Sequence, residues 1–304
     1  MQPRGWRLRT ANRNPELRTA NTTLNREALV VDSIVETADT RTLVLDVGPV
    51  GTYRASQYVS IDPHQFIGLR SFIGYLEHLK GRREAPRAYS MCSAPHEKYL
   101  AITIKEEVYK EGETPYPPLV SGYLVHQVRP GDRIIVSGYA GAYVLPENVE
   151  ERVPHVLHVV AGSGSVPDLA MVKDSLVRHT RLRHTFLYSN KTWDDVIFRD
   201  ELGRLAVAHP ERLRVIHTLT RESEEACKAC GALQGRIGLE VLGEVLDREP
   251  ESLVYICGTG ITVYERRAHA AKGTTPPPRF IETVKAHLGT LRFPPERIKL
   301  ESYG

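Results

Sequence analysis

The sequence lacks the long apolar runs that membrane insertion and secretion require. No apolar run approaches the roughly 18–20 residues of a membrane-spanning helix, and the arginine-rich N-terminus has no apolar signal segment. We therefore expect no membrane span and a cytoplasmic location. The net charge is only +3, and no cluster of lysine and arginine is interleaved with aromatic residues. The sequence therefore gives no indication of nucleic-acid binding.

Cysteine is scarce, with four residues in a chain of 304. Cys227 and Cys230 have the C-x-x-C spacing of half a zinc or redox site. A closed zinc site needs four ligands, however, and the sequence has neither a second such pair nor the spacing of an iron–sulfur protein. We therefore expect no metal site and no iron–sulfur centre, and we interpret Cys227 and Cys230 as two thiols in a loop between a strand and a helix.

The first half of the chain has the pattern of a small β-barrel. Residues 1–27 contain few apolar side chains and predict a flexible tail. After them, short β-like runs alternate with glycine and proline turns, which predicts an FAD-binding antiparallel barrel domain over residues 28–150 when taken with the motifs below. The runs are 28–32, 42–46, 58–62, 87–93, 100–105 and 133–138.

Three further segments of this half have their own signals. Apolar residues recur at helical spacing over 66–80, which predicts an inserted helix. A short helix is expected at 121–126 with Ser121 as its N-cap. Residues 106–118 contain three prolines and predict a loop.

From residue 151 to 304 the pattern changes to alternating strands and helices, which predicts a doubly wound parallel sheet. Taken with the glycine loop described below, residues 151–304 are predicted to form an NAD(P)-binding domain. The expected strands are 156–160, 185–188, 213–218, 253–257 and 297–302, and the expected helices are 168–179, 196–205, 239–246 and 280–288.

The run Arg87-Ala88-Tyr89-Ser90 carries the chemistry of the first domain. Side chains on a strand alternate between two faces, so Arg87 and Tyr89 share one face and Ser90 begins the other. An arginine can hold a phosphate bidentately, and a tyrosine offers a flat aromatic surface with a polar tip. The four residues indicate a flavin site, although an ordinary edge strand has the same pattern.

The run Gly162-Ser163-Gly164-Ser165-Val166-Pro167 carries the chemistry of the second domain. Its glycines allow backbone N–H groups to approach an anion where a buried strand passes into a helix. This arrangement indicates a dinucleotide site, and a tight strand–helix turn without a ligand is the alternative. Three other groups are expected at the carboxyl edge of the same sheet: Cys257-Gly258, Lys191 and Arg221.

These motifs, in this order, resemble those of the ferredoxin–NADP+ reductase superfamily, over roughly residues 29–260 and at the extreme C-terminus. The resemblance implies that Arg87 holds the FAD pyrophosphate, that Tyr89 stacks on the isoalloxazine and that Ser90 lies beside flavin N5. Ala88 is part of that motif and Ser93 is its companion. The remaining flavin contacts that we assign in the barrel are Lys105, Val120 and Ser121.

The resemblance also assigns roles in the second domain. Gly162, Ser163, Gly164 and Pro167 correspond to the pyridine-nucleotide loop, and Lys191 and Arg221 are the candidate cations for the 2′-phosphate of NADPH. Cys257-Gly258 is similar to the C-G motif whose thiol lies near nicotinamide C4. Plant-type members of the family end on an aromatic residue that lies against the flavin. In this chain Tyr303 is the penultimate residue, and the resemblance assigns it the same contact with the flavin.

The implied function is transfer of electrons from NADPH or NADH through FAD to a separate one-electron carrier, such as a ferredoxin, a flavodoxin or an oxygenase component. A flavin or ferric-chelate reductase is one alternative, and a non-catalytic flavin-bearing electron-transfer subunit is another. The chain departs from the family pattern in a long insert at 66–80 and in an apparent insert at 268–278. We also expect the basic segments 4–26 and 80–83 to attract an acidic carrier.

Overall fold

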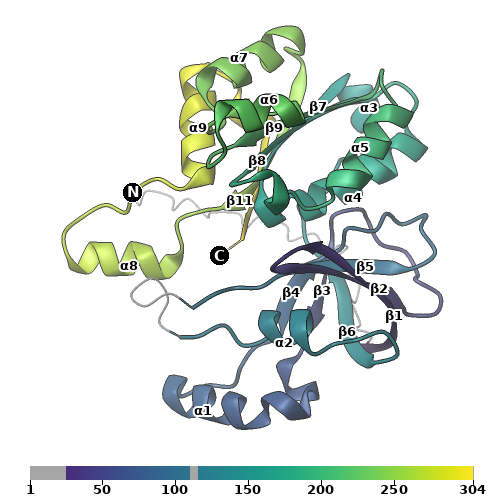
Figure 1. Ribbon diagram of the computed structural model, residues 1–304, viewed down its shortest axis with the longest axis vertical. Coiled ribbons are helices and arrows are strands. Elements are labelled where there is room, and N and C mark those ends of the chain that lie inside the picture. The colour runs from purple at the N-terminus through teal and green to yellow at the C-terminus, as the bar shows by residue number, and fades with distance from the viewer. Residues whose placement is uncertain (1–24, 110–115, 304) are drawn as a thin grey trace, which may run out of the picture.

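The computed structural model describes residues 25–109 and 116–303, which form two six-stranded sheets that lie one above the other in Figure 1. The first sheet has the order β4-β3-β6-β1-β2-β5, and every pairing in it is antiparallel. A bridge between Met91 and Ile102 joins its two edge strands and closes it into the predicted barrel. The strands are β1 (Asn25–Thr37), β2 (Thr40–Asp46), β3 (Tyr58–Ile61), β4 (Arg87–Ser90), β5 (Leu100–Lys105) and β6 (Arg133–Ala140).

The barrel begins earlier than the sequence predicted. β1 starts at Asn25, which pairs with Ser137 of β6, so residues 25–27 belong to the barrel and the prediction that they are part of a tail is wrong. The rest of the predicted tail, residues 1–24, lies outside the described residues, as do residues 110–115 of the predicted loop. The barrel interior is filled by alternating aliphatic side chains, among them Leu43, Leu45, Ile102 and Ile104, which are 0–1% exposed.

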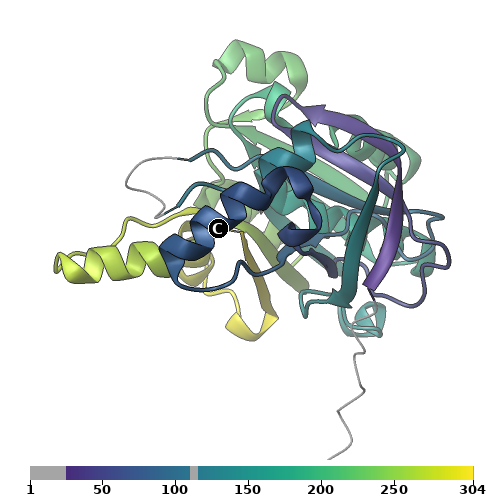
Figure 2. The same cartoon turned by 90° about the horizontal axis from the view of Figure 1, so that it is seen from below.

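The helix predicted at 66–80 is present in α1 (Arg70–Lys80), which two short 3-10 turns precede, Pro63–Gln65 and Ile67–Leu69. Its apolar residues divide between two environments, because Ile73 and Leu76 are buried whereas Tyr75 and Leu79 are more than half exposed. Figure 2 shows α1 lying across the outside of the barrel.

The short helix α2 (Ser121–His126) has Val120, not Ser121, at its N-cap, so the predicted capping role of Ser121 is wrong. The hydroxyl of Ser121 instead accepts a hydrogen bond from the N–H of Glu107, at 3.1 Å. Ser121 therefore ties the helix to the end of the segment that follows β5.

The second sheet has the order β10-β9-β8-β7-β11-β12 and is parallel throughout, as predicted. Figure 1 shows helices on both of its faces. The strands are β7 (His155–Ala161), β8 (Arg183–Asn190), β9 (Leu213–Leu219), β10 (Leu233–Gln234), β11 (Ser252–Thr259) and β12 (Ile298–Tyr303). The helices are α3 (Val149–Arg152), α4 (Ser165–Arg178), α5 (Arg199–Ala208), α6 (Glu224–Cys230), α7 (Leu239–Arg248), α8 (Val263–Ala271) and α9 (Phe280–Thr290).

The strand order of this sheet reverses between β7 and β11. The chain moves outward from β7 through β8 and β9, then returns to place β11 on the other side of β7. Ligands of open α/β sheets bind in the crevice at such a reversal, outside the carboxyl ends of the strands. The segments that leave those two ends are Gly162–Gly164, a single 3-10 turn, and Gly258–Gly260.

Three helices were not predicted from the sequence: the short α3, α6 and α8. α6 carries Cys227 and Cys230, so the prediction that these thiols lie in a loop is wrong; Cys227 is buried, and both are free thiols. α8 occupies the start of the apparent insert and has no buried residue at all. Helical periodicity depends on a buried face, which α8 lacks.

The two domains are held together by polar contacts and a shared apolar cluster. Lys173 of α4 pairs with Glu97 of the barrel at 2.8 Å, and the N–H of Phe198 donates to Glu36 of β1 at 3.1 Å. Cys92, at the end of the barrel strand β4, packs in the apolar cluster of the second domain. None of the helices in the described part of the chain is long and apolar enough to cross a membrane.

Candidate cofactor-binding site

Strand β4 holds the predicted flavin residues on the side of the barrel that faces the second domain. It pairs with β3 in antiparallel register, with Ser90 opposite Tyr58 and Tyr89 opposite Val59. Tyr89 is half-buried against the barrel core, and burial raises the pKa of its hydroxyl. Ala88 is exposed and Ser90 is buried. Arg87, Tyr89 and Ser90 thus form the edge that a ligand between the two domains would meet.

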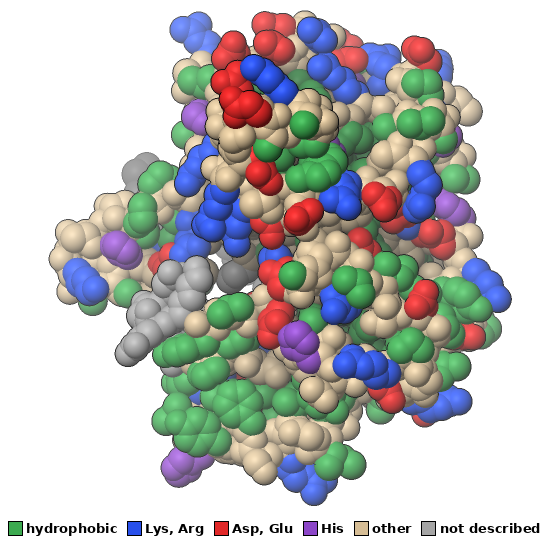
Figure 3. Space-filling view, viewed as in Figure 1, with side chains coloured by type: hydrophobic (Ala, Val, Ile, Leu, Met, Phe, Trp, Pro, Cys, Tyr) green, Lys and Arg blue, Asp and Glu red, His purple; other side chains and the backbone are tan. Residues whose placement is uncertain are grey.

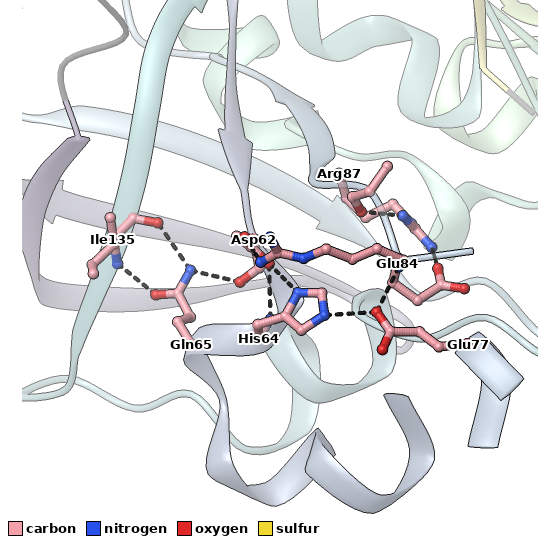
Figure 4. Close-up of polar contacts among 9 residues, drawn as sticks. Asp62, His64, Gln65, Glu77, Glu84, Arg87 and Ile135 are labelled. Atoms are coloured by element: carbon pink, nitrogen blue, oxygen red, sulfur yellow. Dashed lines mark hydrogen bonds and ion pairs between the residues drawn. The ribbon is translucent and has the colours of Figure 1, made fainter. Parts of the chain in front are cut away.

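Arg87 is held at one edge by a buried carboxylate, as Figure 4 shows. Its guanidinium pairs with Glu84 at 2.5 Å and donates to the carbonyl of Ala85. Glu84 is only 4% exposed, and Lys80 pairs with its other oxygen at 2.5 Å. Burial raises the pKa of Glu84, but the hydrogen bonds from Lys80 and Arg87 outweigh burial, so the carboxyl stays ionised. About a third of the Arg87 side chain remains exposed.

Glu84 is held in place by a cluster of polar side chains from α1 and from the turn that follows β3, also visible in Figure 4. Glu77 accepts from the N–H of Glu84 at 2.8 Å and from the His64 ring at 2.8 Å, and Asp62 contacts the other ring nitrogen at 2.6 Å. The hydrogen bonds that the His64 ring donates to Asp62 and Glu77 raise the pKa of His64. The long insert of the barrel therefore fixes the carboxylate that holds Arg87.

The same contacts change the interpretation of the predicted basic segment at 80–83. Lys80 pairs with Glu84, and Arg83 pairs with Asp62 at 3.2 Å. Two of the three cations there are thus neutralised within the barrel, which weakens the expected attraction of an acidic carrier. The other basic segment, residues 4–26, falls almost wholly outside the described residues.

Three predicted flavin residues lie apart from β4 or have their polar atoms engaged. Ser93 is 1% exposed, and its hydroxyl accepts from the N–H of Ala101 at 2.9 Å and contacts Tyr53 at 3.1 Å. Lys105 pairs with Asp39 at 2.6 Å. Val120 is buried in the barrel core. Their predicted contact with a cofactor stays a prediction, since each has a role within the barrel.

The glycine loop packs directly on the end of β11. A Cβ at Gly164 would lie 2.5 Å from the carbonyl carbon of Cys257 and 2.9 Å from the nitrogen of Gly258, distances that real side chains do not reach. Gly162 has a positive φ of 52°, and nothing lies within 4 Å of its Cβ position. Its carbonyl accepts from the hydroxyl of Tyr188 at 2.9 Å. The loop is therefore fixed at Gly164 and open to a ligand at Gly162.

The three residues predicted to be catalytic come together where the domains meet. The hydroxyl of Tyr303 donates to Oγ of Ser90 at 2.5 Å, although 213 positions separate the two residues. Tyr303 also packs against the apolar cluster that contains Cys257, whose strand β11 lies beside β12. The backbone that carries these three side chains comes from the barrel, from β11 and from the C-terminal strand.

Both acidic groups of this cluster are neutral at physiological pH. Burial raises the pKa of the Cys257 thiol well above its usual value, and the charges of Asp168 and Glu301 raise it further. Burial and the neighbouring Cys257 likewise raise the pKa of Tyr303. Cys257 is therefore a neutral thiol, not a thiolate nucleophile.

A buried polar chain beneath the glycine loop was not predicted from the sequence. Asp168, in the first turn of α4, accepts from Tyr143 at 3.2 Å and pairs with His158 of β7 at 2.7 Å, both partners of that pair being 0% exposed. The chain continues from His158 to His184 at 3.0 Å and from His184 to Ser175 at 2.7 Å. Only Asp168 had a signal in the sequence, an acidic residue directly after Pro167 at a helix start.

Lys191 and Arg221 lie next to each other at the carboxyl ends of β8 and β9. The N–H of Arg221 donates to the carbonyl of Lys191 at 2.8 Å, and both side chains are exposed. Neither cation forms an ion pair with any residue of 25–109 or 116–303. Their placement suits an anionic ligand that enters beside the glycine loop.

Comparison with known proteins agrees with this geometry. Residues 159–263 match the family described as oxidoreductase NAD-binding domain. The chain is 26% identical over 285 residues to the ferredoxin reductase component of 3-ketosteroid-9-alpha-monooxygenase of Mycobacterium tuberculosis, covering 91% of this chain and 65% of that protein. Residues 159–263 thus form an oxidoreductase NAD-binding domain, and the chain is similar to the reductase component of an oxygenase.

Solved structures of the superfamily have the same two-domain fold. The FAD/NAD-binding domain of nitric oxide dioxygenase from Vibrio cholerae matches with a TM-score of 0.64 at 23% identity, covering 92% of this chain and 98% of that one. Ferredoxin–NADP+ reductase from Plasmodium falciparum matches with a TM-score of 0.62 at 15% identity, covering 93% and 99%. The predicted two-domain fold is confirmed, and the predicted resemblance agrees with these matches.

The NAD-binding domain and the similarity to flavin-type reductases imply FAD and NAD(P)H as the cofactors, as predicted. The residues of the site fit FAD and NAD(P)H. Arg87 keeps an exposed edge, and the space at Gly162 is open to a ligand. Lys191 and Arg221 are exposed and form no ion pair with a carboxylate among the described residues. The chain spans 54% of the length of Flavohemoprotein A of Dictyostelium discoideum and 65% of that of the monooxygenase component, less than two thirds in both cases.

Proposed function

We propose that this chain is an FAD-dependent oxidoreductase that takes electrons from NADPH or NADH and passes them singly to a separate carrier, such as a ferredoxin, a flavodoxin or an oxygenase component. The observation that carries the proposal is the contact of Ser90, Cys257 and Tyr303 at the junction of the two domains. A flavin ring held by β4 and a nicotinamide held at the ends of β7 and β11 would meet at that point.

In this proposal Arg87 binds the FAD pyrophosphate with its exposed edge. The buried Glu84 holds the opposite edge of the guanidinium and so orients it before the cofactor arrives. A charge-assisted contact of a preoriented arginine is among the stronger single contacts available to a phosphate.

The remaining residues position two rings and exclude water. The hydroxyl of Ser90 accepts a hydrogen bond from Tyr303, so the hydroxyl hydrogen of Ser90 remains available to donate to a nitrogen of the flavin ring. Cys257 presents a small neutral thiol, so it contributes packing without charge beside the nicotinamide. FAD, when bound, supplies the change from two-electron to one-electron transfer, and the protein supplies alignment.

We propose that NADPH is preferred to NADH, because Lys191 and Arg221 have no acidic partner among the described residues and can meet a 2′-phosphate. The separate carrier is supported by a relative whose name includes "ferredoxin reductase component". It is also supported by the absence of any group of three potential metal-ligating side chains within residues 25–109 and 116–303.

The test is FAD retention in Arg87→Ala. Loss of a desolvated charge-assisted contact costs about 2–4 kcal/mol, so the FAD dissociation constant is expected to rise about 30- to 800-fold. Arg82→Ala is the matched control, since Arg82 is an exposed cation five residues away with no ion pair among the described residues. Equal FAD affinity in the two variants would show that Arg87 is not the phosphate anchor.

A further inference from the structure

The inserted helix α8 stands apart from the rest of the protein. It projects beyond the body of the molecule in both ribbon views, and none of its residues is buried (Figures 1 and 2). A helix of nine residues is marginal in water unless packing stabilises it. Val263 and Tyr264 nonetheless expose 64% and 39% of their surface. α8 therefore lacks, within the described chain, the packing that usually sustains so short a helix.

The base of α8 is firmly fixed. Thr262 and Glu265 form a reciprocal capping box, and Nε of Arg279 donates to Glu265 at 2.8 Å across the return of the chain. Three consecutive prolines, at 276–278, stiffen that return. Residues 261–280, which we call the arm, thus form a rigid projection, although the helix in it buries no residue against the described part of the chain.

The arm is strongly basic. Residues 261–280 contain four arginine or lysine residues and one glutamate. Arg267 and Lys272 are exposed and form no ion pair with another described residue, whereas Arg266, although 62% exposed, pairs with Glu282 at 3.7 Å. Figure 3 shows lysine and arginine side chains gathered where α8 meets the lower end of α9.

This basic arm lies beside the proposed flavin site. α8 begins four residues after Thr259, which pairs with Tyr303, and a Cβ on Gly260 would lie 2.7 Å from Oγ of Ser302. On the same face, α1 exposes a row of apolar side chains (Figure 3). They are Ile67 at 81%, Tyr75 at 57% and Leu79 at 51%, Ile67 lying in the turn that precedes the helix.

We propose that α8 and the exposed face of α1 form the docking surface for an acidic one-electron carrier protein, which rests on the proposed function. An apolar patch next to charged residues is the usual composition of a transient protein interface, and the cations of α8 select a partner of opposite charge. Because Lys80 and Arg83 of the predicted steering segment pair with Glu84 and Asp62, the attraction comes mainly from Arg267 and Lys272, which form no ion pair with another described residue.

The experiment compares two charge reversals of equal size. One variant is Arg266→Glu/Arg267→Glu/Lys272→Glu on α8. The matched control is Arg204→Glu/Arg214→Glu/Arg248→Glu, which reverses three exposed cations of α5, β9 and α7 that have no ion pair among the described residues. An acidic [2Fe–2S] ferredoxin is the probe, and a neutral quinone is the alternative acceptor.

We expect the α8 variant to raise the KM for ferredoxin at low ionic strength about tenfold or more and to flatten its dependence on salt. The KM for NADPH and the rate with quinone should stay at wild-type values in both variants. Tyr75→Ser, which keeps the charge, should shorten the lifetime of the ferredoxin complex without changing the salt dependence.

Three results would overturn the proposal. Equal effects of the two charge reversals would mean that net charge, not α8, attracts the carrier, and a raised KM for NADPH in the α8 variant would assign the arm to the nucleotide. Binding of α8 to anionic lipid vesicles, with no binding of ferredoxin, would assign it to a membrane surface.

Calorimetric titration of the FAD-loaded protein with ferredoxin separates this proposal from the proposed function. Wild-type protein that reduces quinone with NADPH but binds no ferredoxin refutes the docking surface alone. Protein that binds ferredoxin through α8 but accepts no electrons from NADPH or NADH refutes the proposed function alone.

Discussion

Substitution of Gly164 by alanine tests whether the glycine loop has to lie against the end of β11. The new Cβ would lie 2.5 Å from the carbonyl carbon of Cys257, whereas ordinary contacts begin at 3.4 Å. The obstructing atoms are backbone, so they cannot rotate away as a side chain would. The loop and β11 must therefore separate by about 1 Å, within the range in which overpacking costs about 1–3 kcal/mol.

The displacement moves the two segments that the proposed function assigns to NADPH. We expect Gly164→Ala to raise the KM for NADPH about tenfold or more, since each 1.4 kcal/mol is about a factor of ten. The melting temperature should fall, while FAD stays bound because its phosphate anchor is in the barrel. Steady-state quinone reduction, thermal denaturation and the flavin absorbance of the purified variant measure the three quantities.

Gly203→Ala is the control, because Gly203 lies within α5 and nothing is within 4 Å of its Cβ position. Alanine there should stabilise the helix slightly and leave the KM unchanged. A Gly164→Ala enzyme with wild-type KM and melting temperature would refute the reasoning, since the close approach would then have no consequence.

Three other substitutions give separate tests. Cys257→Ser should slow reduction of the flavin by NADPH in stopped-flow traces and leave the FAD content unchanged, and equal rates would limit Cys257 to packing. Arg221→Ala should reduce kcat/KM for NADPH about tenfold and leave NADH unaffected, because each 1.4 kcal/mol lost from a phosphate contact is about tenfold; a loss shared by both nucleotides would contradict the 2′-phosphate assignment. His155 is 1% exposed, with its ring between Ser252 and Thr185, and burial lowers its pKa to about 4. As the pH falls below about 6.5, this histidine takes up a proton in the unfolded chain before it does so in the folded protein. The stability that the neutral buried ring provides is therefore present above pH 6.5 and is lost towards pH 4. His155→Gln should reduce the loss of unfolding free energy between pH 7.5 and 5 by about 2 kcal/mol in urea titrations.

The elements that the sequence predicted are those with a strong local pattern. β6 begins with alternating exposed and buried residues, whereas β7 and β11 are almost continuously buried, which is how half-buried and fully buried strands differ in sequence. α8 was missed because no residue of it is buried, and α6 was missed because its seven residues provide a single buried position, Cys227.

The site was predictable only where short motifs carry it. Arg87, Gly162, Gly164 and Cys257 stand in recognisable runs, and the structure brings the loop and the C-G segment together. The contact of Tyr303 with Ser90 joins residues 213 positions apart, so only the fold reveals it. The buried pair of Asp168 and His158 has the same origin, because it depends on how α4 packs on β7.

The most direct test of the central claim is anaerobic mixing of the FAD-loaded protein with one equivalent of NADPH in a stopped-flow spectrometer. The proposed function predicts that the visible flavin absorbance is bleached by NADPH, and that the electrons can then be recovered in an added ferredoxin. An absorbance that excess NADPH and excess NADH leave unchanged, while dithionite bleaches it fully, would contradict the claim.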